Sequence, residues 1–358
     1  MTSDAAVPSP DRIDPLTYPL AIEPETGDGS AVEIAPGILW LRMPLFASLP
    51  WINVWALEDE GGWTIVDTGL RSAKTTAAWQ AAFGGTLQGR PVVRVLCTHM
   101  HPDHCGMAGW IADKFDAPLW MSRLEYLSCR LMAADTGRPA PAEGIRFYRQ
   151  AGWDDAAISD YKAKFGSFGE AIYPLPDAFH RLSDGQFLTI GAHRWQVVMG
   201  NGHSPEHACL YCPELSLLIS GDQVLPRISS NVSVYPTEPD ADPLGDWLAS
   251  LARLRTLIPD DVLVLPAHNS PFHGLHARLD ALIAGHRRGL DSLLLALREP
   301  KRVVDVFAAL FTRPITPSLL GMATGETVAH LNHLLSLNQV SRADDALEVH
   351  WWHARQSV

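Results

Sequence analysis

The chain has 358 residues, of which 47% are hydrophobic and 19% are charged. This composition supplies a large apolar core and argues against global disorder, and the length suggests about two domains. The formal net charge of −12 at pH 7 repels phosphate backbones, so nucleic acid is a poor default partner.

The cysteines and the apolar segments indicate in which cellular compartment the protein is expected. The five cysteines are an odd number at scattered spacings, which suits a reducing cytoplasm rather than a disulfide framework. We interpret Cys209 and Cys212, which form a C-x-x-C, as small core residues. The polar N-terminus has no basic region followed by an apolar run, so no signal peptide is expected. No apolar stretch reaches the ~20 residues that span a bilayer. The sequence predicts a cytoplasmic protein without membrane contact.

The first half of the chain alternates strand and helix patterns. Residues 1–30 are expected to be a flexible N-terminal segment. The apolar runs WALED and WTIVD flank a Glu-Gly-Gly turn, which predicts a β-hairpin after an earlier strand-like run at 32–44. A helix closed by glycine at 73–85, a buried strand at 90–100, a helix at 106–116 and a short strand at 117–122 follow. This alternation predicts an α/β sandwich.

Residues 123–169 interrupt the alternation with a helical pattern that is rich in aromatic side chains. Two interpretations stay open. The insert is a cap over the strand ends that offers an apolar wall to an acyl or aryl group, or its aromatic residues pack a small core of their own. The aromatic residues are Tyr126, Phe147, Tyr148, Trp153, Tyr161, Phe165 and Phe168.

Strand patterns resume after the insert and complete a catalytic domain over residues 31–290. Strands are predicted within 180–204, 207–224 and 261–268, with a helix at 241–257. A long helical hairpin at 276–297 then leads away from the sheets. The last part, 291–358, predicts two helices at 302–311 and 326–342 and a short strand within 345–354.

The stretch THMHPDHCG places four potential metal ligands at the end of the buried strand VVRVLC: His99, His101, Asp103 and His104. His99 and His101 lie two positions apart in extended chain, so both side chains point to one side. Imidazole nitrogens and carboxylate oxygens are ligands for zinc and its neighbours. Four potential ligands on one short loop are too many for a single metal ion with tetrahedral geometry. The cluster therefore suits two metals, each with further ligands from elsewhere in the chain.

Three further ligand types stand at strand ends elsewhere. His203 follows RWQVVMG, Asp222 follows LLISG, and His268 follows VLVLPA. In each case an apolar strand is followed by Gly or Ala near the ligand type. Strands that end at one edge of a sheet would bring all seven side chains together.

This motif set, THMHPDHCG, GHSPEH, SGDQV and LPAHNSP in that order, resembles the metallo-β-lactamase superfamily over about residues 33–290. The resemblance implies an αββα sandwich and two Zn²⁺ ions, or another divalent transition metal. It implies that Asp222 and a water or hydroxide bridge the ions, and that Asp67 in VDTG is a buried support of the histidine loop. The implied ligands are His99, His101 and His203 for one metal and Asp103, His104 and His268 for the other.

Asp222 narrows the implied chemistry. The best-known zinc β-lactamases carry cysteine at this position, whereas aspartate resembles glyoxalase II and lactonases. Two metals lower the pKa of a shared water and polarise a carbonyl oxygen, and Asp103 would orient the nucleophile and accept its proton as the catalytic residue. We therefore expect hydrolysis of a small thioester, lactone or carboxylic ester by a metal-bridging hydroxide.

Substrate contacts are less well defined by the sequence. The loop after Asp222, QVLPRISSNVSVYP, begins at the metals, so Arg227, Asn231 and Tyr235 are candidates for a small-molecule substrate. Tyr173 is a candidate of the same kind. Loop polarity alone also explains these side chains.

The C-terminal residues resemble the small winged-helix module of some metallo-β-lactamase-like hydrolases. The helix within 326–342 carries few cations, which argues against DNA binding. We expect the module to pack against the catalytic domain or a second subunit, as in a homodimer. The alternatives to an esterase-type hydrolase are a nuclease or RNA-processing protein of the same fold, and a binding protein with an inactive site.

Overall fold

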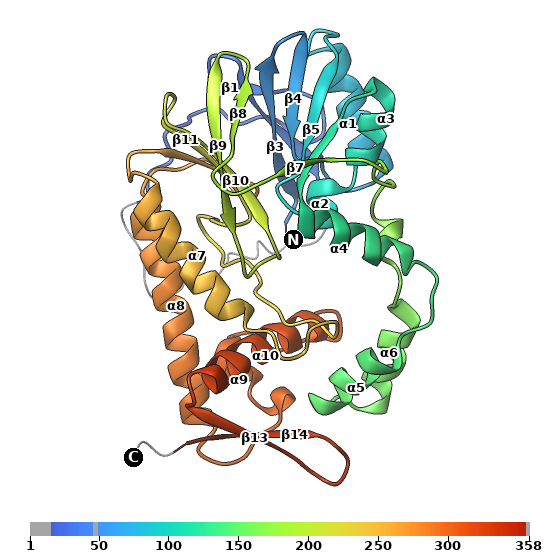
Figure 1. The fold of residues 1–358 in the computed structure, drawn as a ribbon, viewed down its shortest axis with the longest axis vertical. Coiled ribbons are helices and arrows are strands. Elements are labelled where there is room, and N and C mark those ends of the chain that lie inside the picture. Colours follow the sequence, from blue (N-terminus) through green and yellow to red (C-terminus); the bar gives the residue numbers. More distant parts are fainter. Residues whose placement is uncertain (1–15, 46–48, 356–358) are drawn as a thin grey trace, which may run out of the picture.

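The structure, a computed structural model, describes residues 16–45 and 49–355. Its larger part contains two β-sheets, and a smaller helical part lies below them in Figure 1. Residues 1–15 of the expected flexible segment lie outside the described residues. Residues 16–30 contact the body of the protein through a bridge between Thr17 and His273 and an ion pair of 2.8 Å between Glu23 and the buried Arg42.

The first sheet has seven strands in the order of the chain. Its first four strands form three antiparallel pairs, and the pair β3–β4 is the predicted hairpin at the Glu-Gly-Gly turn. The last four are parallel to one another. The strands are β1 (Val32–Ala35), β2 (Ile38–Pro44), β3 (Trp51–Asp59), β4 (Gly62–Val66), β5 (Val92–Leu96), β6 (Leu119–Ser122) and β7 (His180–Leu182).

The second sheet has five strands in the order β12-β11-β10-β9-β8. Strand β10 is antiparallel to both neighbours, and β12 is parallel to β11. Strands β9, β11 and β12 therefore run in the same direction, and their carboxyl ends meet at one edge. The strands are β8 (Phe187–Ile190), β9 (His193–Gly200), β10 (His207–Cys212), β11 (Leu217–Gly221) and β12 (Leu263–Pro266).

Apolar side chains fill the space between the two sheets, and helices cover the outer faces. Trp40, Trp55 and Trp195 are fully buried between the sheets. Helices α1 (Ala73–Gly84) and α3 (Ala108–Phe115) pack on the first sheet, and α7 (Pro243–Leu257) and α8 (Leu275–Ala296) pack on the second. The predicted αββα sandwich is confirmed, and its driving force is burial of one apolar face from each layer.

The prediction of a helical hairpin at 276–297 is wrong, because α8 is one continuous helix of 22 residues. Its buried residues repeat at helical spacing from Leu275 to Leu293. Gly285 and Gly289 each disfavour a helix by about 1 kcal/mol relative to alanine, but this continuous apolar face outweighs them. Gly289 also allows a close approach, since a Cβ there would lie 3.0 Å from Leu310.

The insert is helical, as predicted, with α4 (Arg123–Ala134), α5 (Ala142–Gln150) and α6 (Asp155–Lys164). Its aromatic rings largely contact one another, as in the stack of Tyr148 on Trp153 at 4.2 Å. The Trp153 indole also donates a 2.9 Å hydrogen bond to the Thr324 hydroxyl in α10. Figure 1 shows α5 and α6 beside the C-terminal helices. The insert thus has a small aromatic core that continues into the C-terminal part.

The C-terminal part holds α9 (Phe307–Leu310), α10 (Leu320–Ser336), β13 (Val340–Asp344) and β14 (His350–Ala354). The predicted helix at 302–311 is reduced to a 3₁₀ turn and the single turn α9. The predicted helix at 326–342 starts earlier and ends at Ser336. Asn338 then adopts a left-handed φ of 59°, and Val340 pairs with Ala354 in a strand. No helix in the described ranges is long and apolar enough to cross a membrane.

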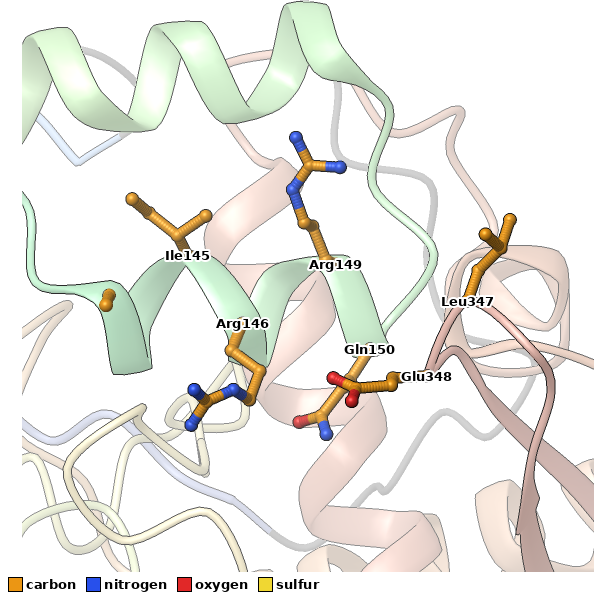
Figure 2. Close-up of a pocket in the computed structure, with 7 residues that line it drawn as sticks. Ile145, Arg146, Arg149, Gln150, Leu347 and Glu348 are labelled. Atoms are coloured by element: carbon orange, nitrogen blue, oxygen red, sulfur yellow. The ribbon is translucent and has the colours of Figure 1, made fainter.

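A shallow hollow of about 210 Å³ lies where the insert meets the β13–β14 turn (Figure 2). None of the predicted metal ligands or substrate contacts lines it. We therefore regard it as a surface feature of the interface between insert and C-terminal part. Its lining residues are Ala142, Ile145, Arg146, Arg149, Gln150, Leu347 and Glu348.

Two buried histidines join α8 to α10. His286 Nδ1 lies 3.2 Å from His330 Nε2, and His330 Nδ1 donates to the Glu326 carbonyl oxygen at 2.8 Å. The ring of His286 therefore donates to His330, and its Nε2 accepts from the Ser229 hydroxyl at 3.3 Å. Burial and the neighbouring imidazole lower the pKa of His286 to about 3, and burial lowers that of His330 to about 4.

This pair makes the fold sensitive to acid. Both folded pKa values lie below the ordinary 6.5, so the unfolded chain takes up protons first and stability falls as the pH drops from about 6.5 toward 4. The variant His330→Gln still accepts the hydrogen bond from His286 but does not titrate in this range. Between pH 7 and pH 5, we expect its free energy of unfolding to fall by about 1–2 kcal/mol less than that of the wild type. Urea unfolding of the metal-free proteins measures this difference. Equal losses in the two proteins would contradict it.

Candidate metal centre

The predicted ligand residues converge at the common edge of the two sheets. Strand β5 leads to His99 in the first sheet, while β9, β11 and β12 lead to His203, Asp222 and His268 in the second. Their ligand atoms fall into overlapping groups whose members lie within 4.8 Å of one another. The groups are His99–His101–His203, His99–His104–Asp222 and Asp103–His104–His268.

The loop that carries four of these residues has a defined local structure. His101 is the N-cap of the one-turn helix α2 (Pro102–Cys105), in which Pro102 sits at the first helical position, where its missing N–H costs nothing. Gly106 then passes close to a neighbouring turn, since a Cβ there would lie 2.7 Å from the Gly69 carbonyl oxygen. Any larger residue at 106 would clash with the backbone of Gly69 and Arg71.

The three-histidine group, His99, His101 and His203, forms one side of the centre. His99 Nε2 lies 2.9 Å from His101 Nδ1. The ring of His203 lies 4.6 Å from that of His101 and 5.0 Å from that of His99. Nitrogens from three rings thus face one small volume, which suits one metal ion.

The second group, Asp103, His104 and His268, forms the other side. His268 Nε2 lies 3.4 Å from Asp103 Oδ2, and His104 Nε2 lies 3.8 Å from the same oxygen. Asp222 lies between the groups: its Oδ2 is 3.5 Å from both His203 Nε2 and His104 Nε2, and its Oδ1 is 3.6 Å from His268 Nε2. A carboxylate in this position can contact an ion on either side.

Hydrogen bonds donated by Nδ1 fix the direction of four imidazoles. His104 donates to Asp67 at 2.8 Å, His203 to the Asn231 carbonyl at 2.7 Å and His268 to the Trp51 carbonyl at 3.2 Å. The Thr98 hydroxyl gives its proton to Asp67, so it accepts from His99 Nδ1 at 3.1 Å. In each ring Nε2 is then the atom left to face a metal, as in metal-ligating histidines.

Buried atoms without partners point to the same use. The Nε2 atoms of His104 and His203 and Oδ1 of Asp222 are buried and make no hydrogen bond. Unsatisfied polar atoms of this kind are rare in native interiors, because each costs about 1–3 kcal/mol. Divalent cations on the two sides of Asp222 would satisfy all three atoms, so the residues present fit a metal centre.

The electrostatics favour the ligand forms of most of these groups. Burial and neighbouring histidines hold the pKa of His99 well below its usual range and lower that of His101 to about 3. Burial raises the pKa of Asp103, but His104 and His268 outweigh it and bring the pKa to about 2. For His104, burial lowers the pKa, but the carboxylates of Asp103, Asp67 and Asp222 outweigh burial and raise the pKa well above 6.5. That proton would leave when a cation binds.

His207 also belongs to the site, although it was not among the predicted ligands. It is fully buried, its ring stacks on His99 at 4.8 Å, and its Nε2 accepts the backbone N–H of Asp222 at 3.1 Å. Gly221, at a φ of 49°, leaves room for this ring, because a Cβ there would lie 2.5 Å from His207 Nε2. In the sequence, the only sign of this role is that His207 is the second histidine of the motif GHSPEH.

The four predicted substrate contacts are placed differently. Asn231 is the nearest, through its carbonyl bond to His203, and its amide donates to Glu326 Oε2 of α10 at 2.8 Å. Tyr235 is 46% exposed. Arg227 lies over the ring of Tyr18, and Tyr173 packs under Arg71. Of these four residues, only Asn231 makes a hydrogen bond to a predicted metal ligand.

Two stacked sheets between helices, with histidines and aspartates at one shared edge, define a metal-dependent hydrolase of the αββα class. Comparison with known proteins agrees. The metallo-beta-lactamase superfamily matches residues 52–268, and the metallo-beta-lactamase-like C-terminal domain matches residues 290–355. The chain belongs to the metallo-β-lactamase superfamily.

Individual relatives match much of the chain. A solved β-lactamase domain protein of Burkholderia ambifaria is 38% identical, covers 95% of this chain and 98% of its own, and superposes with a TM-score of 0.87. A probable metallo-hydrolase of Bacillus subtilis is 22% identical over 88% of this chain and 95% of its own length. An atrochrysone carboxyl ACP thioesterase of Aspergillus fumigatus is 28% identical over 66% of this chain but only 42% of its own.

Asp67 offers a test of the support beneath the ligands. Its carboxylate accepts from the Thr98 amide at 2.8 Å and from His104 at 2.8 Å. In Asp67→Asn an amide NH₂ must face one of these donors, so we expect metal affinity to fall about 10–100-fold and the free energy of unfolding to fall by about 1–3 kcal/mol. Competition with a chelator and urea unfolding measure the two effects. Asp160→Asn, on an exposed helix face, is the control, and an unchanged metal affinity in Asp67→Asn would refute the expectation.

Proposed function

We propose that this protein is a dinuclear zinc-dependent hydrolase that cleaves a small ester-type bond, with thioesters first among the candidates and lactones and carboxylic esters next. The single observation that carries the proposal is the pair of ligand groups on either side of Asp222, which share one buried edge of the sandwich. The thioesterase relative supports the thioester preference.

When bound, two divalent cations would supply a nucleophilic water of lowered pKa and would polarise the substrate carbonyl. The residues of the first ion would be His99, His101 and His203, and those of the second Asp103, His104 and His268, with Asp222 shared. Another divalent transition metal could replace zinc, because imidazole and carboxylate ligands suit several ions.

Asp103 is the residue we assign to proton transfer. Its carboxylate is held by His268 and is ionised at neutral pH, since its pKa is about 2. It is one of the two ligand residues, with His101, that are only partly buried. A carboxylate at the open side of the centre can orient the nucleophile and accept its proton while the leaving group departs.

The absence of a cysteine among the ligand groups around Asp222 supports glyoxalase-like or lactonase-like specificity over β-lactam hydrolysis. The C-terminal part, with α10 followed by the β13–β14 hairpin, is proposed to be winged-helix-like. It contacts the centre indirectly, through Asn231 and Glu326. We also propose a cytoplasmic protein with a small-molecule substrate, no nucleic-acid partner, and a homodimeric state as the first alternative to a monomer.

Metal content is the first test. The protein as purified should hold close to two metal ions per chain, mostly zinc, by elemental analysis. His101→Ala removes a ligand of the first group and should abolish hydrolysis, whereas His353→Ala, an exposed histidine on β14, should leave it intact. Trace metal in the wild type, or full activity of His101→Ala, would overturn the proposal.

A substrate panel is the second test. Aryl esters, acyl thioesters, lactones, a β-lactam and single-stranded RNA should be compared at equal metal loading. We expect turnover of the ester-type compounds, with the highest kcat/KM for a thioester. Turnover of RNA alone would favour the alternative, a nuclease or RNA-processing protein of the same fold.

A further inference from the structure

Glu125 is a fully buried carboxylate on α4 that no strand-end motif contains. It occupies the first turn of the insert, next to the strand end of β6. A buried carboxylate is costly unless its oxygens are satisfied, so its partners indicate what it does.

The two oxygens of Glu125 reach two different loops. Oε2 accepts the backbone N–H of Met100 at 2.9 Å, and Oε1 accepts that of Glu206 at 2.7 Å. Met100 lies between His99 and His101, and Glu206 follows His203 by three residues. One side chain thus joins the two chain segments that carry all members of the three-histidine group.

The junction of β6 and α4 is fixed to the same place by further bonds. The Ser122 hydroxyl donates to the Glu206 carbonyl at 2.7 Å, and the Leu124 amide donates to Glu206 Oε2 at 2.8 Å. These contacts hold α4 against the His203 loop, so Glu125 cannot move away from its two amides without breaking several hydrogen bonds.

The second group of ligands is held by other residues. His104 is oriented by Asp67, and His268 by the Trp51 carbonyl. Among the hydrogen bonds of the described residues, none joins Glu125 to Asp103, His104 or His268. Glu125 therefore bonds only to amides beside the three-histidine ligands, whereas Asp67 reaches both groups, His104 directly and His99 through the Thr98 hydroxyl.

We propose that Glu125 is a positioning residue for one metal only: it sets the separation of the His99–His101 loop from His203, and so the affinity of the three-histidine group. The inference rests on the proposed dinuclear site. Hydrogen bonds from backbone amides to an ionised carboxylate are short and strong, and residues that orient metal ligands typically change metal affinity 10–100-fold when mutated.

Glu125→Gln tests the proposal with little change of volume. The glutamine keeps one acceptor oxygen but presents an NH₂ group to the other amide. Titration of the metal-free protein with Zn²⁺ against a chromophoric chelator should show one of the two sites weakened about 10–100-fold, with the other unchanged. The d–d absorption of the Co²⁺ form should change for the same site. Glu143→Gln, an exposed glutamate on α5, should match the wild type in both measurements.

A double-mutant cycle assigns the weakened site. In a His268→Ala background, where only the three-histidine group is intact, Glu125→Gln should reduce affinity for the remaining ion. In a His101→Ala background it should cause no further loss, because the ion that remains there is held by Asp103, His104 and His268, with which Glu125 shares no hydrogen bond. Equal loss in both backgrounds, or no loss in either, would overturn the proposal.

Folding of the variant is checked by circular dichroism of the metal-free protein. If Glu125→Gln does not fold, Glu125→Asp replaces it throughout: it keeps the charge but withdraws the oxygens, so we expect a smaller loss confined to the same site, and wild-type affinity at both sites would refute the assignment. The wild-type titration separates this from the proposed function, since a wild type that binds no divalent ion overturns both.

Discussion

The centre depends on one constraint: many polar side chains must share a small volume that excludes water. His99, His104 and His207 are completely buried there, and Asp222 is nearly so. Such groups are tolerated only when each ring or carboxylate has a fixed partner. The backbone and Asp67 supply partners for the outward-facing atoms, and the inward-facing atoms stay free for a ligand. The arrangement of sheets follows, because parallel directions of β9, β11 and β12 are what bring their ends to one edge.

Much of this arrangement was accessible from the sequence. The ligand types at strand ends could be recognised because apolar runs mark strands, and because imidazoles and carboxylates at the end of such runs are unusual. The structure brings all seven together. The hairpin at Glu60–Gly61, the helix at 73–85 and the helical insert were also predicted, since turn glycines and helical spacing are local signals.

Other features were not accessible, because they depend on contacts between distant segments. The sequence shows His207 only as a second histidine in GHSPEH, and its bond to the Asp222 amide appears only in the fold. Glu125 lies in an ordinary helical pattern, and nothing local shows that its oxygens face two loops. The continuity of α8 was missed because its two glycines weaken the helical signal, whereas packing against α7 and α10 decides the outcome. The end of α10 depends on the pairing of β13 with β14.

The length of α8 has a mechanical consequence. A helix of 22 residues extends for about 33 Å, and Figure 1 shows it running from the sheets to the C-terminal helices. It packs on α7 at one end and, through His286 and Gly289, on α10 and α9 at the other. Because α8 is continuous and packed at both ends, it holds the C-terminal helices at a fixed distance from the sheets. The C-terminal part cannot move away from the sheets without exposing apolar surface along α8, so Asn231, which α10 holds through Glu326, keeps its place beside His203.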